Sequence, residues 1–205
     1  FNHLSQRTGR MVFLNPETGA LTSFPSVEGD VSAILSDGKG GYFVGGDFKR
    51  VGDLDQAYLV HLTPDGTPNP KWRPKLNNAV TCLALSDKTL FVGGEFSSIN
   101  NKGRSKLATI DPATGKLQAW EISVDKAPTV LLHLDSTLYV GGTFSKVARS
   151  EHKYFIALDV NKGGSVAWKP QTTGPVNALA VDKGVIFAGG RFKDFAGTPR
   201  SSLAA

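Results

Sequence analysis

Histidine and cysteine are the side chains that most readily bind metals or transfer protons at neutral pH, and this sequence has four histidines and one cysteine. Zinc sites usually draw two of their ligands from residues spaced a few positions apart. No such pair occurs among His3, His61, His133, His152 and Cys82. The sequence therefore predicts no metal site. We expect His61 and His133 to be packed within strands and hydrogen-bonded.

Other arrangements that carry chemistry are also incomplete. Serines are plentiful, but the Gly-x-Ser-x-Gly motif of a nucleophilic serine is absent. The run Asp53-Leu54-Asp55 lacks the further spaced oxygens of a calcium loop, so we expect a solvated loop there. We predict no catalytic residue and no bound cofactor, and hence a protein that is not an enzyme.

A repeat, rather than a cluster of reactive residues, organises the chain. The motif Gly-Gly-x-Phe recurs with its first glycine at positions 45, 93, 141 and 189, a constant step of 48 residues. A fixed period of this size is typical of repeat architectures. We expect one array over residues 1–205, with partial units at 1–30 and 175–205 and complete units at 31–78, 79–126 and 127–174.

Each unit has the pattern of four short strands. In the unit 79–126, strands are expected at 80–85, 90–96, 106–110 and 117–122, with a polar loop at 97–104. No segment has a sustained helical period. Four-stranded units repeated about every 40–50 residues are typical of β-propeller blades, so we predict an all-β propeller.

The chain starts and stops inside a repeat. Residues 1–4 match 48–51, and residues 200–203 match 104–107. We therefore expect a fragment or arc of a larger ring of about five to eight blades. Any targeting segment would lie outside it.

Two sets of repeated residues are expected to be structural. Glycine inside a strand is unfavourable, so paired glycines indicate a bulge, a bend or the close approach of another backbone. A large ring at one place in each unit suits sheets that stack on their neighbours. The glycines are Gly45, Gly46, Gly93, Gly94, Gly141, Gly142, Gly189 and Gly190, and the rings are Trp72, Trp120 and Trp168.

Positive charge is concentrated in the loops that follow Gly-Gly-x-Phe. The net charge is +5, and the segments 1–11, 48–59, 96–107, 144–155 and 192–203 hold 12 of the 23 cations against four acids. In antiparallel four-stranded units these loops emerge on one face, which we predict to be electropositive. The cations are Arg7, Arg10, Lys49, Arg50, Lys102, Arg104, Lys106, Lys146, Arg149, Lys153, Lys193 and Arg200.

An electropositive face attracts an acidic protein surface, an anionic glycan or lipid headgroups. The alternative is that loop lysines only keep a β protein soluble and its edges unpaired. We expect no nucleic acid partner, because no nucleic-acid-binding module and no aromatic residues interleaved with the basic loops are present. The candidate partner-binding residues are Lys49, Arg50, Lys102, Arg104, Lys146 and Arg149, with Asp47, Glu95 and Arg191 in the variable slot of Gly-Gly-x-Phe.

The motifs resemble those of a known family. The pattern Phe/Tyr-Val-Gly-Gly-x-Phe-x-x-Val at 43–51 and 139–147, and Asp-x-x-Thr-Gly at 111–115 before Trp120, resemble the bacterial delta-60 β-propeller repeats. Similar repeats occur in fungal cortical polarity proteins. The resemblance implies a propeller that is extracellular, at the cell surface or periplasmic, often within a larger protein or assembly. It implies no common activity and no catalytic residues.

Residues 108–115 also look like the tryptophan-docking motif of quinoprotein dehydrogenases. Trp120 falls one residue later than in that motif, and Cys82 alone cannot supply the paired cysteines typical of the quinone site. We therefore expect no quinone cofactor.

Three functions remain open at this point. The first is a non-catalytic secreted or cell-surface scaffold that binds a protein or an anionic glycan. The second is a structural segment of a surface filament or adhesin. The third is a lyase-like or glycosidase-like enzyme with an axial site, which needs titrating residues at the start of each first strand. Those positions hold Ser32, Thr81, Thr129 and Asn177.

Overall fold

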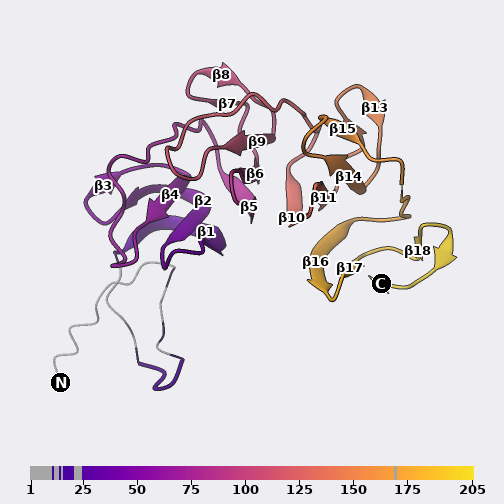
Figure 1. Cartoon of the computed structure of the whole chain (residues 1–205), viewed down its shortest axis with the longest axis horizontal. Helices are drawn as coiled ribbons and strands as arrows, with labels where there is room; N and C mark the ends of the chain where they lie inside the picture. The colour runs from indigo at the N-terminus through magenta and orange to yellow at the C-terminus, as the bar shows by residue number, and fades with distance from the viewer. Residues whose placement is uncertain (1–10, 12–13, 15, 21–24, 169) are drawn as a thin grey trace.

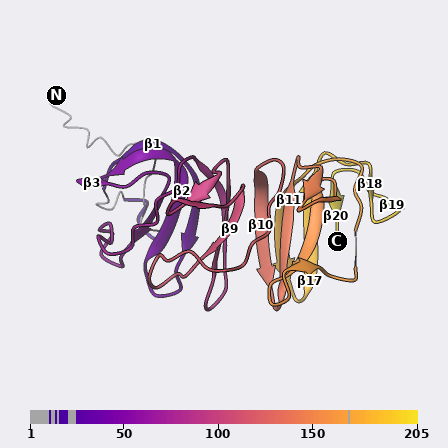
Figure 2. The same cartoon turned by 90° about the horizontal axis from the view of Figure 1, so that it is seen from above.

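The computed structural model describes residues 11, 14, 16–20, 25–168 and 170–205, and in them it contains strands and no helix. Figure 1 shows small antiparallel sheets, the blades, fanning about a common centre, with the first strand of each blade innermost. Figure 2 shows the same sheets from the side. The predicted all-β propeller architecture is confirmed, and the described sheets form an open arc. No helix in the described part of the chain could cross a membrane.

Each blade begins with three strands paired antiparallel, the second lying between the first and the third. The first blade consists of β1 (Val27–Ser36), β2 (Tyr42–Val51) and β4 (Leu59–Leu62), and the second of β5 (Val80–Leu85), β6 (Leu90–Gly94) and β9 (Leu107–Ile110). The third blade consists of β10 (Pro128–Leu134), β11 (Thr137–Gly142), β14 (Phe155–Asp159) and β15 (Gly164–Ser165), and the fourth of β16 (Val176–Asp182), β17 (Val185–Gly190) and β20 (Leu203–Ala204).

The fourth strands are shorter than the sequence predicts. The expected strand at 117–122 is reduced to one bridge between Ile110 and Leu117, and in the third blade it is the two residues of β15. The chain bends soon after this pairing, and the side chain of Trp120 packs against Phe91. An outermost strand has a partner on one side only, so short pairing leaves little exposed edge.

The sequence predicts polar loops after the second strands. In the structure these loops form small hairpins. These are β7 (Ser98–Ile99) with β8 (Lys102–Gly103), β12 (Lys146–Val147) with β13 (Ser150–Glu151), and β18 (Asp194–Phe195) with β19 (Thr198–Pro199). In the first blade, β3 (Leu54–Asp55) pairs with the end of β2. Asn100 and Asn101 both have positive φ, as a tight hairpin turn between twisted strands requires.

The paired glycines lie where strands approach most closely: the first glycine of a pair faces the next blade, and the second faces the backbone at the first strand of its own blade. A Cβ on Gly45 would lie 2.5 Å from Cγ1 of Val80 in the next blade, and a Cβ on Gly94 would overlap the backbone oxygen of Ala79. Opposite each glycine pair the first strand has a bulge, because one residue of that strand is left without a partner. The four bulge residues are Ser32, Thr81, Thr129 and Asn177.

The core lies between blades rather than within them. Phe43 and Leu59 of the first blade pack with Val92 and Ile110 of the second, and all four are buried. Removing such a side chain from water stabilises the fold by about 1.5–3 kcal/mol. Each sheet therefore depends on its neighbours for most of its stability.

We expect the substitution Gly94→Ala to lower the free energy of unfolding by about 1–3 kcal/mol, because its Cβ has no space beside Ala79. Denaturant unfolding followed by circular dichroism measures the change. Gly103→Ala is the matched control, since a Cβ there meets nothing within 4 Å and its effect should stay within about 0.5 kcal/mol. Equal losses for both variants would contradict this explanation of the glycine pair.

Candidate functional site

The hairpins after the second strands are held rigidly by side chains at equivalent positions of the linkers that precede each blade. Asn77 accepts the N–H groups of Ser97 and Ser98 on Oδ1 at 2.9 and 3.0 Å. Asp125 does the same one repeat later, and the hydroxyl of Thr173 does so one repeat after that. Three different side chains therefore provide the same acceptor, and no single residue type could have revealed it from the sequence.

Further contacts join each hairpin to the body of its blade. Single bridges connect Leu76 with Ile99, Val124 with Val147, and Thr172 with Phe195. The residue before each third strand has a left-handed backbone. Its N–H donates to the carbonyl of the Phe in Gly-Gly-x-Phe, and its own carbonyl accepts the N–H of the second glycine. These residues are Tyr58, Lys106, Tyr154 and Ser202. The sequence contains no signal for them, because left-handed positions normally favour glycine or asparagine.

We call the end of the blades that carries these hairpins and their flanking loops the loop face. Lys49, Lys102, Lys146 and Arg149 are exposed on it, and none forms an ion pair with another described residue. In Figure 2, β3 and β18 lie toward the same end of the blades. Arg7 and Arg10, which were expected to contribute to this face, lie outside the described residues.

Two of the predicted arginines, Arg50 and Arg104, have acidic neighbours. Arg50 Nε lies 3.4 Å from Asp55 Oδ1, and both side chains are substantially exposed. Arg104 is mostly buried, with Nη1 3.1 Å from Glu121 Oε1 and 2.7 Å from the carbonyl of Gly103. The structure therefore leaves Arg104 less available to a partner than its sequence position suggests.

The variable slot of Gly-Gly-x-Phe is exposed in all four blades and carries Asp47, Glu95, Thr143 and Arg191. Glu95 accepts a 2.7 Å bond from Nζ of Lys106. Arg191 forms no ion pair with another described residue. The slot thus carries a negative, a neutral or a positive side chain depending on the blade, next to hairpins whose backbones are alike.

A cleft of about 540 Å³ opens on the loop face beside the β12–β13 hairpin of the third blade. It is lined by Glu151, His152 and Lys153 on one side and by Gln171 and Thr172 of the following linker on the other. These side chains supply both hydrogen-bond donors and acceptors, which suits a polar group of a partner.

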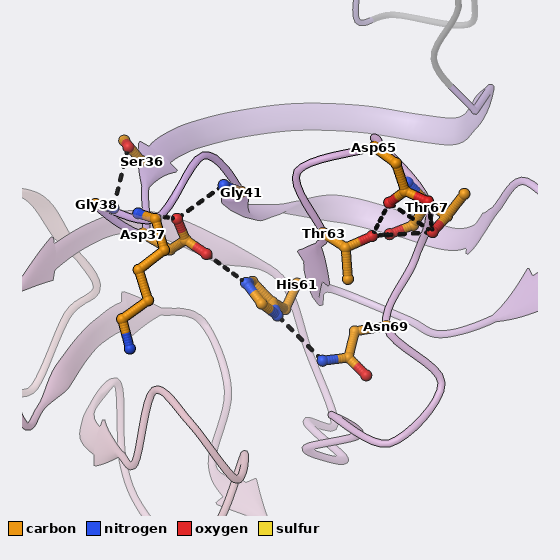
Figure 3. A network of polar contacts seen from close by, with 10 residues as sticks. Ser36, Asp37, Gly38, Gly41, His61, Thr63, Asp65, Thr67 and Asn69 are labelled. Atoms are coloured by element: carbon orange, nitrogen blue, oxygen red, sulfur yellow. Dashed lines mark hydrogen bonds and ion pairs between the residues drawn. The ribbon is translucent and has the colours of Figure 1, made fainter.

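The opposite end of the blades carries a polar network around His61, shown in Figure 3. Nε2 of His61 lies 2.9 Å from Asp37 Oδ2, and Nδ1 lies 3.3 Å from the amide of Asn69. The ring also stacks on Phe43 at 4.8 Å. Both ring nitrogens of His61 are therefore engaged in holding the blade together.

Asp37 holds the hairpin between β1 and β2. Burial raises the pKa of this carboxyl, but hydrogen bonds from His61 and from the N–H groups of Lys39 and Gly41 outweigh it, so the pKa is lowered.

A second histidine lies in a cleft of about 800 Å³ between the second and third blades, at the same end as His61. His133 stacks on Phe91 at 5.3 Å, and burial lowers its pKa although the charges of Asp135 and Asp87 act to raise it. Residues from two blades line this cleft, so sequence spacing could not have indicated it. No group of three or more metal-binding side chains occurs in the described part of the chain.

The positions proposed for an axial enzyme site are the bulge residues of the first strands. The hydroxyl of Thr81 donates to the carbonyl of Pro128 at 2.6 Å, and that of Thr129 donates to the carbonyl of Val176 at 3.1 Å. Each bond ties one first strand to the next. These hydroxyls are therefore already used as links between blades.

The chain also matches a protein family over part of its length. A family model described as a domain of unknown function (DUF5122) β-propeller matches residues 35–70, which include β2 and β4. No curated protein matches the chain at a significant level. The blade architecture and this match define a β-propeller repeat protein.

Solved structures with the same fold include designed proteins. The computationally designed Ika8 protein is similar over 96% of this chain and 58% of its own, with a TM-score of 0.60 and 16% identity. The designed Ika4 protein is similar over 82% of this chain and 90% of its own, with a TM-score of 0.54 and 14% identity. BamB from Moraxella catarrhalis has a TM-score of 0.34 and 14% identity, over 89% of this chain and 74% of its own. The chain thus spans less than two thirds of Ika8.

We expect the acid stability of this fold to depend on Asp125. Burial raises the pKa of Asp125, but hydrogen bonds from the Ser145 hydroxyl and from the N–H groups of Lys146 and Ser145 outweigh it and hold the pKa at about 2. Because the folded pKa lies below the ordinary 3.8, the carboxylate stabilises the fold above about pH 4, and this contribution is lost as the pH falls to about 2. The carboxylate is exposed, so we expect a loss of about 1 kcal/mol.

The control for this prediction is Asp125→Asn, which copies Asn77 of the preceding repeat and cannot titrate. Urea unfolding of both proteins at a series of pH values measures the difference. The wild-type protein should lose about 1 kcal/mol more than the variant between about pH 4 and pH 2. Parallel pH profiles for the two proteins would show that Asp125 does not titrate in this range.

Proposed function

We propose that this protein is a non-catalytic scaffold, secreted or displayed at the cell surface, whose loop face binds an anionic glycan or an acidic protein surface. The observation that supports it most is the set of exposed cations on successive blades. Lys49, Lys102, Lys146 and Arg149 have no ion-pair partner among the described residues. The motifs at 43–51 and 111–115 further suggest a relation to the delta-60 repeats of bacterial surface proteins.

The rigidity of the loop face favours binding. Linker side chains hold the hairpin backbones, so the cations project from frames that lose little freedom when a partner arrives. Repulsion between like charges on neighbouring blades is relieved by an extended anionic ligand that contacts several of them. A flexible loop with the same lysines would lose more entropy on binding.

The two ends of the blades differ in charge, which gives binding a direction. The turns opposite the loop face carry aspartates such as Asp111 and Asp159, whose pKa is held low by hydrogen bonds from the N–H groups of Thr114 and Lys162. These carboxyls stay ionised and oppose the attraction that the exposed lysines of the same turns, such as Lys116 and Lys162, have for an anionic partner. We therefore expect the partner on the loop face, whose segments hold 12 cations against four acids.

A scaffold role also agrees with how the reactive side chains are used. His61 is bonded on both ring nitrogens, and the bulge hydroxyls of Thr81 and Thr129 link neighbouring blades. An axial lyase or glycosidase would need titrating groups where these hydroxyls stand. We therefore favour binding over catalysis.

The test is a fourfold charge reversal on the loop face, in which Lys49, Lys102, Lys146 and Arg149 are each changed to Glu. Binding to heparin as the anionic glycan probe, and to a neutral dextran, is measured across a salt series. We expect the wild-type protein to bind heparin at low salt with an affinity that falls steeply as salt screens the charges. The reversed protein should bind at least about tenfold more weakly, because each lost cation costs several tenths of a kcal/mol or more.

The matched control places the same charge change on the other end of the blades. Lys39, Lys88, Lys116 and Lys162 are exposed in the opposite turns, and changing them to Glu alters the net charge equally. This variant should keep most of the affinity for heparin. Equal losses in both variants would mean that net charge alone governs binding. No binding by the wild-type protein at low salt would exclude an anionic glycan and leave an acidic protein to be tested with acidic peptides.

A further inference from the structure

Two clefts lie between consecutive blades at the end opposite the loop face, and they differ in size. The cleft between the first and second blades has a volume of about 560 Å³, and the one between the second and third blades about 800 Å³. Each has a described blade on both sides. We call the larger one, which is lined by Trp120, His133 and Asn161 among others, the turn-end cleft.

One position of the third strand accounts for the difference. His61 of β4 and Thr109 of β9 each pair with the Phe of the second strand in their blade. The ring of His61 lies 5.9 Å from that of Trp72, which is 1% exposed and does not line the smaller cleft. Thr109 has a shorter side chain, and Trp120 in the place of Trp72 is partly exposed and lines the turn-end cleft. Threonine in place of histidine therefore opens the cleft onto an indole ring.

The polar partners of this position also differ between the two blades. In the first blade, Asp37 and Asn69 bind the two ring nitrogens of His61, as Figure 3 shows. Ser86 and Gln118 have the equivalent places in the second blade, judged by their backbone hydrogen bonds. Their side chains donate instead to backbone carbonyls of the turn between β5 and β6, at 3.3 and 2.9 Å. The residue that replaces the histidine thus lacks both partners.

The hydroxyl of Thr109 is left unsatisfied as a result. Thr109 is 1% exposed, and its Oγ1 has no hydrogen-bond partner among the described residues. A buried hydroxyl without a partner is destabilising and uncommon in proteins. Because it has no hydrogen bond to break, rotation about χ1 can direct it toward a group seated in the cleft. The wall of the cleft therefore holds a polar group that a ligand can satisfy.

Aromatic rings form the apolar part of the same wall. The ring of Trp120 packs edge-on against Phe91 at 6.1 Å, and that of His133 stacks on Phe91 at 5.3 Å. Burial lowers the pKa of His133, so at neutral pH its ring is uncharged and has one donor and one acceptor nitrogen. These contacts hold the rings in place before a ligand arrives, which favours binding.

The rim of the cleft is polar and carries both signs of charge. Asp87 and Lys88 are exposed in the turn between β5 and β6, Asp135 in the turn between β10 and β11, and Asn161 in the turn after β14. Two carboxylates oppose an anionic ligand. An ammonium ligand could only donate, and would leave the donors of Lys88 and Asn161 without acceptors.

A sugar matches this arrangement of groups. Its hydroxyls both donate and accept, and its C–H groups form an apolar face that packs on aromatic rings. The volume of the cleft lies within the range of small-molecule sites, about 300–1,000 Å³.

We propose that the turn-end cleft binds a neutral saccharide unit. Trp120 and His133 contact the ring of the sugar, Thr109 turns its hydroxyl toward it, and the rim side chains bind the outer hydroxyls. The site is distinct from the loop face, because it lies at the opposite end of the blades and requires no charge on the ligand.

Saturation-transfer NMR and titration calorimetry of the full chain test this site. The probes are glucose, galactose, mannose and N-acetylglucosamine, with a disaccharide of each. We expect at least one of them to bind with a dissociation constant on the order of millimolar, as suits a ligand of this size. Binding should be unchanged across a salt series, because the ligand is uncharged.

Three variants locate the binding. Trp120→Ala should weaken it by about tenfold or more, because the aromatic contact is lost. Trp168→Ala is the matched control, since Trp168 has the equivalent place in the third blade and borders a different cavity of about 200 Å³. Thr109→His copies the first blade and should abolish binding by filling the cleft.

Thr109→Val keeps the shape of the side chain and removes only the hydroxyl. It should weaken sugar binding by about threefold to tenfold. Its unfolding by urea should occur at no lower concentration than that of the wild-type protein, because the lost hydroxyl has no partner. This variant keeps the test valid if Trp120→Ala does not fold.

Several results would overturn the proposal. They are the absence of binding to every neutral saccharide, equal losses in Trp120→Ala and Trp168→Ala, or binding of choline in place of sugars. Heparin binding should be the same in Thr109→Val as in the wild-type protein, and the fourfold charge reversal of the loop face should keep its affinity for the neutral sugar. Failure of either site is therefore distinguishable from failure of the other.

Discussion

The structure depends on the close approach of strands at the paired glycines, where the first glycine faces the next blade and the second faces the first strand of its own blade. At this place a first strand passes so near the preceding second strand that a methyl group on Gly45 would overlap Val80. The bulge opposite the glycines projects the hydroxyl of Thr81 toward the next first strand, where it binds the carbonyl of Pro128. Backbone approach, bulge and interblade hydrogen bond therefore form one unit, and the rings of the interblade core pack around it.

This constraint also shapes the loop face. The second glycine donates its N–H to a left-handed residue before the third strand, as Gly94 does to Lys106, and that residue in turn donates to the Phe of the motif. The loop is thus closed at its base by backbone bonds that are the same in every blade. Side chains beyond this base are free to vary, and the slot with Glu95 and Arg191 is where they do.

Two surfaces with different physical character result. The loop face is polar and charged, and its cations interact with an anionic partner through long-range forces that salt weakens. The side chains of Val185 and Phe187 on β17 are exposed and apolar, so this surface differs from the loop face in that it carries no charge.

The sequence by itself determined the fold, because the 48-residue step of Gly-Gly-x-Phe and the alternation of apolar strands with turns are local patterns. It also indicated a basic loop face from the positions of its cations. Only the tertiary structure decided the hairpins of the loops, the ion pair that holds Arg104 on Glu121, and the different burial of Trp72 and Trp168. Equivalent residues of a repeat have the same local sequence pattern, but their exposure and partners depend on which neighbour lies beside them in space.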